Sequence, residues 1–123
     1  MEWITVLIVL GVAAIFLGLK KLGTVSPDVA REYLRQGAKV IDVRGPEEYR
    51  ARHLPNAINI PLGDLESRIG RHAPNKEDVL LLHCLSGGRS GLGSRVLKRM
   101  GYTKVFNLGS FGRAEKIVGG SGK

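Results

Sequence analysis

Residues 79–90 read Val79-Leu80-Leu81-Leu82-His83-Cys84-Leu85-Ser86-Gly87-Gly88-Arg89-Ser90. The apolar run at the start of this stretch has the length and composition of a strand that is covered on both faces of a parallel sheet. After this stretch, apolar residues recur at the spacing of a helix, at Leu92, Val96, Leu97 and Met100. The stretch therefore predicts a strand, a loop and a helix, and it places Cys84 at the start of the loop.

This loop holds the only cysteine of the chain, directly before a predicted helix. Backbone N–H groups and the positive end of the helix dipole favour a thiolate at such a position and can hold an anion beside it. Gly87 and Gly88 allow the backbone to curl around the sulfur, and Arg89 adds a full positive charge. Cys84 is therefore the candidate nucleophile, and an inert buried cysteine is the alternative.

Apolar runs and helical patterns alternate on both sides of this stretch. Short strands are predicted at residues 24–25, 40–43, 57–60, 79–83 and 105–108, and helices at 27–36, 46–52, 62–69 and 90–100. Such alternation predicts an α/β fold with a central parallel sheet of about five strands and helices on both faces. Ligands of such sheets bind outside the carboxyl ends of the strands, which is where Cys84 lies.

The N-terminal segment has a different composition. Residues 3–19 carry no charge, and Lys20 and Lys21 follow them directly. A helix of this length covers about 26 Å, at the short end of what spans a bilayer. We therefore expect one transmembrane helix in residues 1–21, with residues 3–19 in contact with membrane lipid. The two lysines place the following domain on the cytoplasmic side of a single-pass membrane protein.

Two other interpretations of this segment are weaker. A cleaved signal peptide begins with positive charge and ends at a small-residue site, whereas this chain begins with Met1 and Glu2. A buried core helix that is apolar all round needs more protein around it than so small a domain provides. Ala14 and Gly18 form a small-xxx-small pair, which allows a homodimer through paired helices.

The length and the charge of the chain indicate how many domains and which partners to expect for the 102 residues after the N-terminal segment. They have room for one domain, expected at residues 22–118, followed by a flexible Gly-Ser-rich tail at 119–123. The net charge of +8 favours anionic neighbours, but the cations are scattered and not interleaved with aromatic residues, so nucleic acid is not an expected partner. No histidines have metal-ligand spacing with Cys84, and no metal or other cofactor is predicted.

Two further stretches read Val40-Ile41-Asp42-Val43-Arg44-Gly45-Pro46-Glu47-Glu48-Tyr49 and His53-Leu54-Pro55-Asn56-Ala57-Ile58-Asn59-Ile60-Pro61-Leu62. Together they resemble the first sequence signature of rhodanese domains, the sulfurtransferases. Residues 84–90 resemble the active-site loop, and Gly101, Tyr102, Val105 and 107–109 the closing signature. The resemblance covers residues 22–115 in the family's order and implies a rhodanese-like fold.

The resemblance also implies the activity of a membrane-anchored thiosulfate sulfurtransferase. Cys84 would take a sulfane sulfur from a small anion such as thiosulfate and pass it, as a persulfide, to cyanide or an external thiol. An external acceptor is needed because the chain has no second cysteine. The substrate would be bound by the loop residues Leu85, Ser86, Gly87, Gly88, Arg89 and Ser90.

Supporting roles are expected for three residues of the first signature. Asp42 and Arg44 would be held by pairing with Glu47 or Glu48, because charges near the domain interior need partners. Direct contact with the substrate is the alternative for these two residues. His53 would hydrogen-bond between loop and sheet. His83 is expected to be structural, since neighbours on a strand point to opposite faces.

Two other functions fit parts of the sequence. A cysteine phosphatase or arsenate reductase is the enzymatic alternative, but its signature has five residues between cysteine and arginine, and only four separate Cys84 from Arg89. A loop one residue shorter suits a smaller site around a sulfur atom. A membrane-tethered binding module without turnover is the other alternative, and the presence of Cys84 with Gly87 and Arg89 favours the enzyme.

Overall fold

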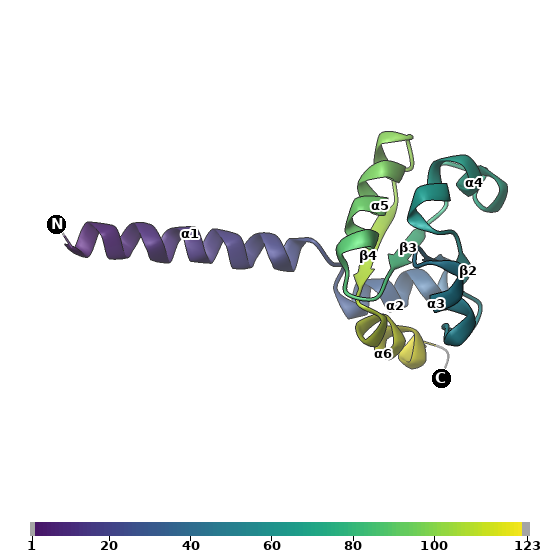
Figure 1. Ribbon diagram of the computed structural model, residues 1–123, viewed down its shortest axis with the longest axis horizontal. Coiled ribbons are helices and arrows are strands. Elements are labelled where there is room, and N and C mark those ends of the chain that lie inside the picture. Colours follow the sequence, from purple (N-terminus) through teal and green to yellow (C-terminus); the bar gives the residue numbers. More distant parts are fainter. Residues whose placement is uncertain (1, 122–123) are drawn as a thin grey trace.

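A parallel sheet forms the centre of the domain, in strand order β2-β1-β3-β4 (Figure 1). The computed structural model describes the backbone of residues 2–121 and the side chains of residues 2–13 and 23–120. Within this part, the sheet has four strands, which are β1 (Lys39–Asp42), β2 (Ile58–Asn59), β3 (Leu80–His83) and β4 (Val105–Gly109).

Helices connect the strands and cover both faces of the sheet. They are α1 (Glu2–Leu22), α2 (Pro27–Arg35), α3 (Pro46–Ala51), the 3₁₀ turn η1 (Leu62–Asp64), α4 (Leu65–His72), α5 (Gly88–Arg99) and α6 (Phe111–Ser121). Leu80 and Leu82 of β3 pack in one apolar cluster with Leu65 of α4 and Leu97 of α5. Leu81 packs on the other face with residues of α2 and α6. The predicted α/β sheet with two covered faces is therefore confirmed.

The sheet has one strand fewer than expected, because Thr24 and Val25 do not form a strand. The backbone N–H of Val25 donates to the carbonyl of Asn107 on the outer edge of β4, at 2.9 Å. The carbonyl of Val25 accepts a hydrogen bond from the side chain of Arg113 and not from a neighbouring strand. A single backbone bond does not make a ladder, so the segment only runs along the edge of β4 before Pro27 starts α2.

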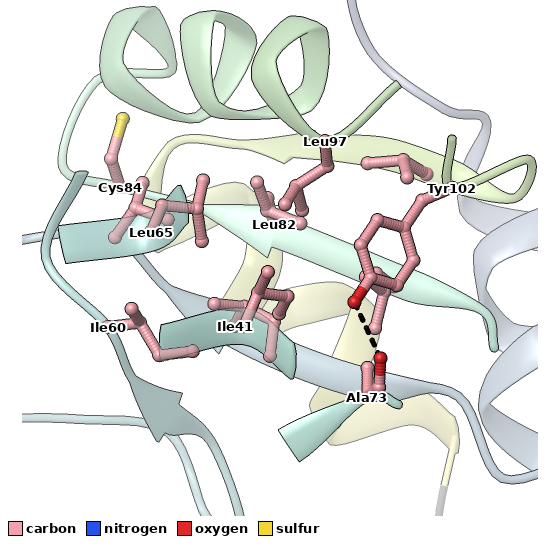
Figure 2. Close-up of a cluster of buried hydrophobic side chains, with 12 residues drawn as sticks. Ile41, Ile60, Leu65, Ala73, Leu82, Cys84, Leu97 and Tyr102 are labelled. Carbon is pink, nitrogen blue, oxygen red and sulfur yellow. Dashed lines mark hydrogen bonds between the residues drawn. The ribbon is translucent and has the colours of Figure 1, made fainter. Parts of the chain in front are cut away.

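Close packing of α5 on the sheet fixes the position of the loop before it. A Cβ atom on Gly93 would lie 2.9 Å from Leu82 Cδ2 and 3.1 Å from Leu65 Cδ2, so any side chain at this position would displace these two buried leucines. The cluster beneath α5 extends from Tyr102, whose hydroxyl donates to the Ala73 carbonyl at 2.6 Å, to Cys84 (Figure 2). The first turn of α5 is thereby held over the end of β3.

The C-terminal segment differs from the sequence prediction. Helix α6 was not expected, and it continues to Ser121, so residues 119–121 belong to this helix and not to a flexible tail. Phe111, Ala114 and Ile117 form its buried face. Their spacing of three is a helical signal, which the glycines at both ends of the segment hide. The remaining tail residues, 122 and 123, lie outside the described residues.

Helix α1 extends away from the domain (Figure 1). Its apolar side chains between Trp3 and Val12 are exposed. The small-residue pair of Ala14 and Gly18 lies outside the described side chains. Among the residues that the structure describes, no helix is both long enough and apolar enough to cross a membrane.

Candidate active site

Cys84 lies at the carboxyl end of β3, at the start of the loop that leads into α5, as the sequence predicts. The backbone of the loop is fastened to the end of β4. The Cys84 N–H donates to the Gly109 carbonyl at 3.2 Å, and the Leu85 carbonyl accepts from the Phe111 N–H at 3.1 Å. Gly109 has a φ of +93°, which disfavours any residue with a side chain. The end of β4 therefore sets the course of the loop around the sulfur.

The loop surrounds the Cys84 sulfur with hydrogen-bond donors. The N–H of Gly87 points at Sγ from 3.0 Å and that of Ser90 from 3.4 Å. Gly87 reaches this position with a φ of +104°, in the left-handed region. Figure 2 shows the sulfur directed toward α5, and the residue itself has no exposed surface. The site is thus a small cradle of N–H groups, closed around one sulfur atom.

These donors stabilise the thiolate. Burial by itself raises the pKa of the Cys84 thiol, but hydrogen bonds from Ser90 and from the backbone N–H groups of Gly87 and Ser86 outweigh it. The pKa of Cys84 therefore lies below its usual value. Because the thiolate is the nucleophilic form of cysteine, the loop increases the reactive fraction at neutral pH.

The Ser90 hydroxyl connects the loop to β4. Its oxygen lies 3.4 Å from Cys84 Sγ, 2.6 Å from Asn107 Oδ1 and 3.1 Å from the Gly87 carbonyl. A hydroxyl has only one hydrogen to donate, and Asn107 Oδ1, at the shortest distance, is its strongest acceptor. Asn107 Oδ1 also accepts from the Gly109 N–H at 2.8 Å, which fixes the orientation of the amide. The hydroxyl can turn its hydrogen from Asn107 to Sγ when Cys84 is ionised, whereas the backbone N–H groups of Gly87 and Ser90 point at the sulfur in either state.

Arg89 is paired with an acidic residue of α3. Its Nη1 lies 2.6 Å from Glu48 Oε1 and its Nη2 2.9 Å from Oε2. Glu48 Oε1 also accepts from the Gly45 N–H at 3.0 Å. Arg89, and next the Gly45 N–H, lower the pKa of Glu48 to about 2, and the pair raises the pKa of Arg89. The thiolate also contributes to the raised pKa of Arg89, so the guanidinium lies within its field.

Asp42 and Arg44 form a buried ion pair with each other, and the prediction that Glu47 or Glu48 holds them is wrong. Arg44 Nε donates to both carboxylate oxygens of Asp42, at 3.0 and 3.1 Å, and Nη2 donates to Oδ2 at 2.8 Å. Arg44 also donates to the Arg52 carbonyl and lies over the Phe111 ring. Both charges are close enough in sequence to pair across the end of β1. Their hydrogen bonds, together with the bond from the Arg44 N–H to Asp42 Oδ1 at 2.9 Å, hold the turn after β1.

Two histidines have structural surroundings. His83 is fully buried on the face opposite Cys84 and meets the Phe111 ring edge to face, as the alternation along the strand predicts. Its Nε2 has no hydrogen-bond partner among the described residues and lies 3.7 Å from Asp42 Oδ2. His53 is exposed, stacks on Tyr49 and lies 2.9 Å from the Tyr49 carbonyl. His53 therefore closes the end of α3, and the expected bond between loop and sheet is not formed.

The six predicted loop residues are brought together but have different exposures. Leu85 and Ser86 are exposed, whereas Ser90 is buried beside the sulfur. Sequence reasoning missed the roles of Glu48 and Asn107, although both lie within the signature stretches. Among the described residues, no three His, Cys, Asp or Glu side chains gather where they could share a metal ion.

The comparisons with known proteins concern the domain as a whole. The family model of the rhodanese-like domain matches residues 26–112. The chain belongs to the rhodanese-like domain family. The match includes β1 to β4, the Cys84 loop and the first residues of α6. The resemblance in the three signatures is therefore confirmed at the level of the whole domain.

Solved rhodanese structures resemble the chain in fold as well as in sequence. A rhodanese from E. coli solved with anions is 40% identical, with a TM-score of 0.61 over 63% of this chain and 91% of that one. The human single-domain sulfurtransferase TSTD1 is 31% identical, with a TM-score of 0.66 over 76% of this chain and 95% of that one.

Curated relatives are similar over a shorter part of their length. The thiosulfate sulfurtransferase PspE of Escherichia coli is 45% identical over 69 residues, which cover 56% of this chain and 66% of the relative. The putative sulfur carrier protein YrkF of Bacillus subtilis is 34% identical over 67% of this chain and 46% of the relative. The chain thus spans less than two thirds of the length of these relatives.

Proposed function

We propose that the protein is a rhodanese-type thiosulfate sulfurtransferase that carries a sulfane sulfur on Cys84. The observation that carries this proposal is the cradle of N–H groups around Cys84 Sγ, with the Gly87 N–H at 3.0 Å. The cradle stabilises a negative sulfur, whether it is the thiolate or the terminal sulfur of a persulfide. The name of the 45% identical relative, a thiosulfate sulfurtransferase, supports the same activity.

The first half of the reaction loads the cysteine. The Cys84 thiolate attacks the outer sulfur of thiosulfate, a new S–S bond forms, and the bond between the two thiosulfate sulfurs breaks. Sulfite leaves with the electron pair of that bond, and Cys84 becomes a persulfide anion. Cys84 has no exposed surface, so the donor reaches Sγ only when part of loop 85–89 moves aside.

The second half transfers the sulfur to an acceptor. Cyanide or a thiolate attacks the terminal sulfur of the persulfide, and the Cys84 thiolate leaves in its original state. Thiocyanate is the product with cyanide. Since Cys84 is the only cysteine, the acceptor must come from outside the chain. The N–H groups of Gly87 and Ser90 stabilise the leaving thiolate in this step as they stabilise the attacking thiolate in the first.

This proposal is tested by the rate of thiocyanate formation from thiosulfate and cyanide. Because the two half-reactions are separate, double-reciprocal plots at several cyanide concentrations are expected to give parallel lines, the pattern of a covalent intermediate. Lines that intersect would show that both substrates bind before any transfer. The absence of thiocyanate above the background reaction would contradict the proposal altogether.

We further propose that α1 anchors the domain to a membrane, on the cytoplasmic side. The support is the uncharged run of residues 3–19 with Lys20 and Lys21 after it, together with the exposed apolar side chains from Trp3 to Val12. A homodimer through paired helices is part of the same proposal.

Alkaline carbonate extraction of membranes from cells that express the full chain tests the anchor. The protein is expected to stay in the membrane pellet, because lipid-embedded helices resist extraction at high pH whereas peripheral proteins are released. A reporter that works only in the cytoplasm is expected to be active when it is fused after Lys123. A reporter that works only outside the cytoplasm is expected to be inactive at the same position. Release of the protein into the supernatant would overturn the anchor, and a reporter active only outside the cytoplasm would overturn the orientation.

A further inference from the structure

The charge of Arg89 is already neutralised in the structure. Both carboxylate oxygens of Glu48 contact the guanidinium, at 2.6 and 2.9 Å, in the fork geometry that is the strongest form of this ion pair. Glu48 is itself held in place by the Gly45 N–H at the start of α3. The pair is therefore built from two elements, α3 and α5, and is not a chance contact of two flexible side chains.

The residues that precede Arg89 in the loop carry no charge. They are Leu85, Ser86, Gly87 and Gly88. Arg44 is turned away into its buried pair with Asp42. Arg89 is thus the cation within the loop of residues 84–90 that surrounds Sγ, and Glu48 cancels its charge at close range. Both side chains of the pair are a little over one-third exposed, so solvent screens the pair in part but leaves the carboxylate accessible to a competing anion.

We propose that Glu48 is a specificity-determining residue that weakens the binding of doubly charged sulfur donors relative to singly charged ones. A dianion such as thiosulfate competes with the carboxylate for the Arg89 guanidinium and is repelled by it. The repulsion is proportional to the charge of the donor, so a monoanionic thiosulfonate or persulfide loses less. This inference rests on the proposed sulfur transfer at Cys84, and it adds that the charge of the sulfur donor affects how well the donor binds.

The test compares Glu48→Gln with the wild type. Glutamine keeps one oxygen for the Gly45 N–H and for Arg89 but removes the negative charge, so the geometry of the loop is retained. We expect the KM for thiosulfate to fall about three- to tenfold, which is the scale of one charge acting across a partly exposed site. The KM for benzenethiosulfonate, a monoanion, should fall by clearly less. The kcat is expected to stay unchanged, because the N–H groups around Sγ are not altered.

Glu47→Gln is the matched control. Glu47 is the neighbour of Glu48 on α3, is exposed and forms no ion pair with any described residue. Its substitution makes the same change in net charge, so its KM values should remain those of the wild type. An equal fall in KM for the two donors, an equal fall in the control, or an unchanged or higher KM for thiosulfate in Glu48→Gln would each overturn the proposal.

A binding measurement separates this inference from the proposed activity. Calorimetric titration with thiosulfate uses Cys84→Ser and the double variant Cys84→Ser with Glu48→Gln, neither of which needs turnover. The double variant is expected to bind thiosulfate about three- to tenfold more tightly. Equal or weaker binding contradicts the role of Glu48 even if the wild type is active. Tighter binding supports it even if the wild type forms no thiocyanate, in which case only the proposed transfer fails.

Discussion

Cys84→Ser is expected to reduce thiocyanate formation to the rate measured without protein. A serine hydroxyl in this loop does not ionise at neutral pH, and oxygen does not take over a sulfane sulfur from thiosulfate. The N–H groups that lower the pKa of the Cys84 thiol cannot compensate for an alcohol, whose ordinary pKa is far higher. The measurement is the initial rate with saturating thiosulfate and cyanide, at equal protein concentrations.

Two controls separate lost chemistry from lost structure. The thermal midpoint of Cys84→Ser should stay near that of the wild type, because serine is similar in size and can accept the Gly87 and Ser90 N–H bonds. Ser94→Ala is the second control, since the Ser94 hydroxyl donates to the Ser90 carbonyl within α5 and does not reach the sulfur. This variant should retain most of the activity. A Cys84→Ser protein that forms thiocyanate at a rate comparable with Ser94→Ala would remove the basis for a cysteine mechanism.

Asp42→Ala is expected to have the largest effect on stability. The substitution leaves the Arg44 guanidinium buried, with 6% of its side chain exposed, and removes the acceptor of three of its hydrogen bonds. Loss of one partner of a buried ion pair costs about 3–5 kcal/mol of unfolding free energy. The backbone turn after β1 is also affected, because Asp42 Oδ1 accepts from the Arg44 N–H at 2.9 Å. Urea denaturation measures the change.

Glu32→Ala is the matched comparison for this prediction. Glu32 binds Arg35 in a similar two-bond arrangement, at 2.8 and 3.0 Å, but the two side chains are more than half exposed. The expected loss is much smaller than for Asp42→Ala, because solvent screens an exposed ion pair. The difference between the two variants measures the effect of burial at equal chemistry. Similar losses in both would show that the Asp42–Arg44 pair is not important for folding.

The sequence predicts the parts of the fold that depend on local pattern. The apolar run before Cys84 and the helical spacing after it locate β3, the loop and α5 within about two residues of their observed bounds. Periodicity did not reveal that Val25 makes only one backbone bond to β4, since a two-residue apolar segment has the same composition whether or not it pairs. Strand pairing is a tertiary property, and so short a segment carries no signal for it.

The candidate site shows the same division between local and tertiary information. Cys84 and the glycines around it were identified from the loop sequence, because their chemistry depends on neighbours in the chain. The partner of Arg89 was not, because Glu48 lies 41 residues away on α3. Asn107, which orients Ser90 from β4, was missed for the same reason. The sequence lists the charged residues, but which of them form ion pairs depends on the fold.

The central claim is that Cys84 carries a sulfane sulfur, and mass spectrometry tests it most directly. The purified protein is incubated with thiosulfate, freed of small molecules and digested without reductant. The account predicts that the peptide containing Cys84 gains the mass of one sulfur atom, that sulfite appears in equal amount, and that cyanide removes the added mass while thiocyanate forms. An unmodified Cys84 peptide in protein that turns over thiosulfate would contradict the persulfide, and with it the proposed mechanism.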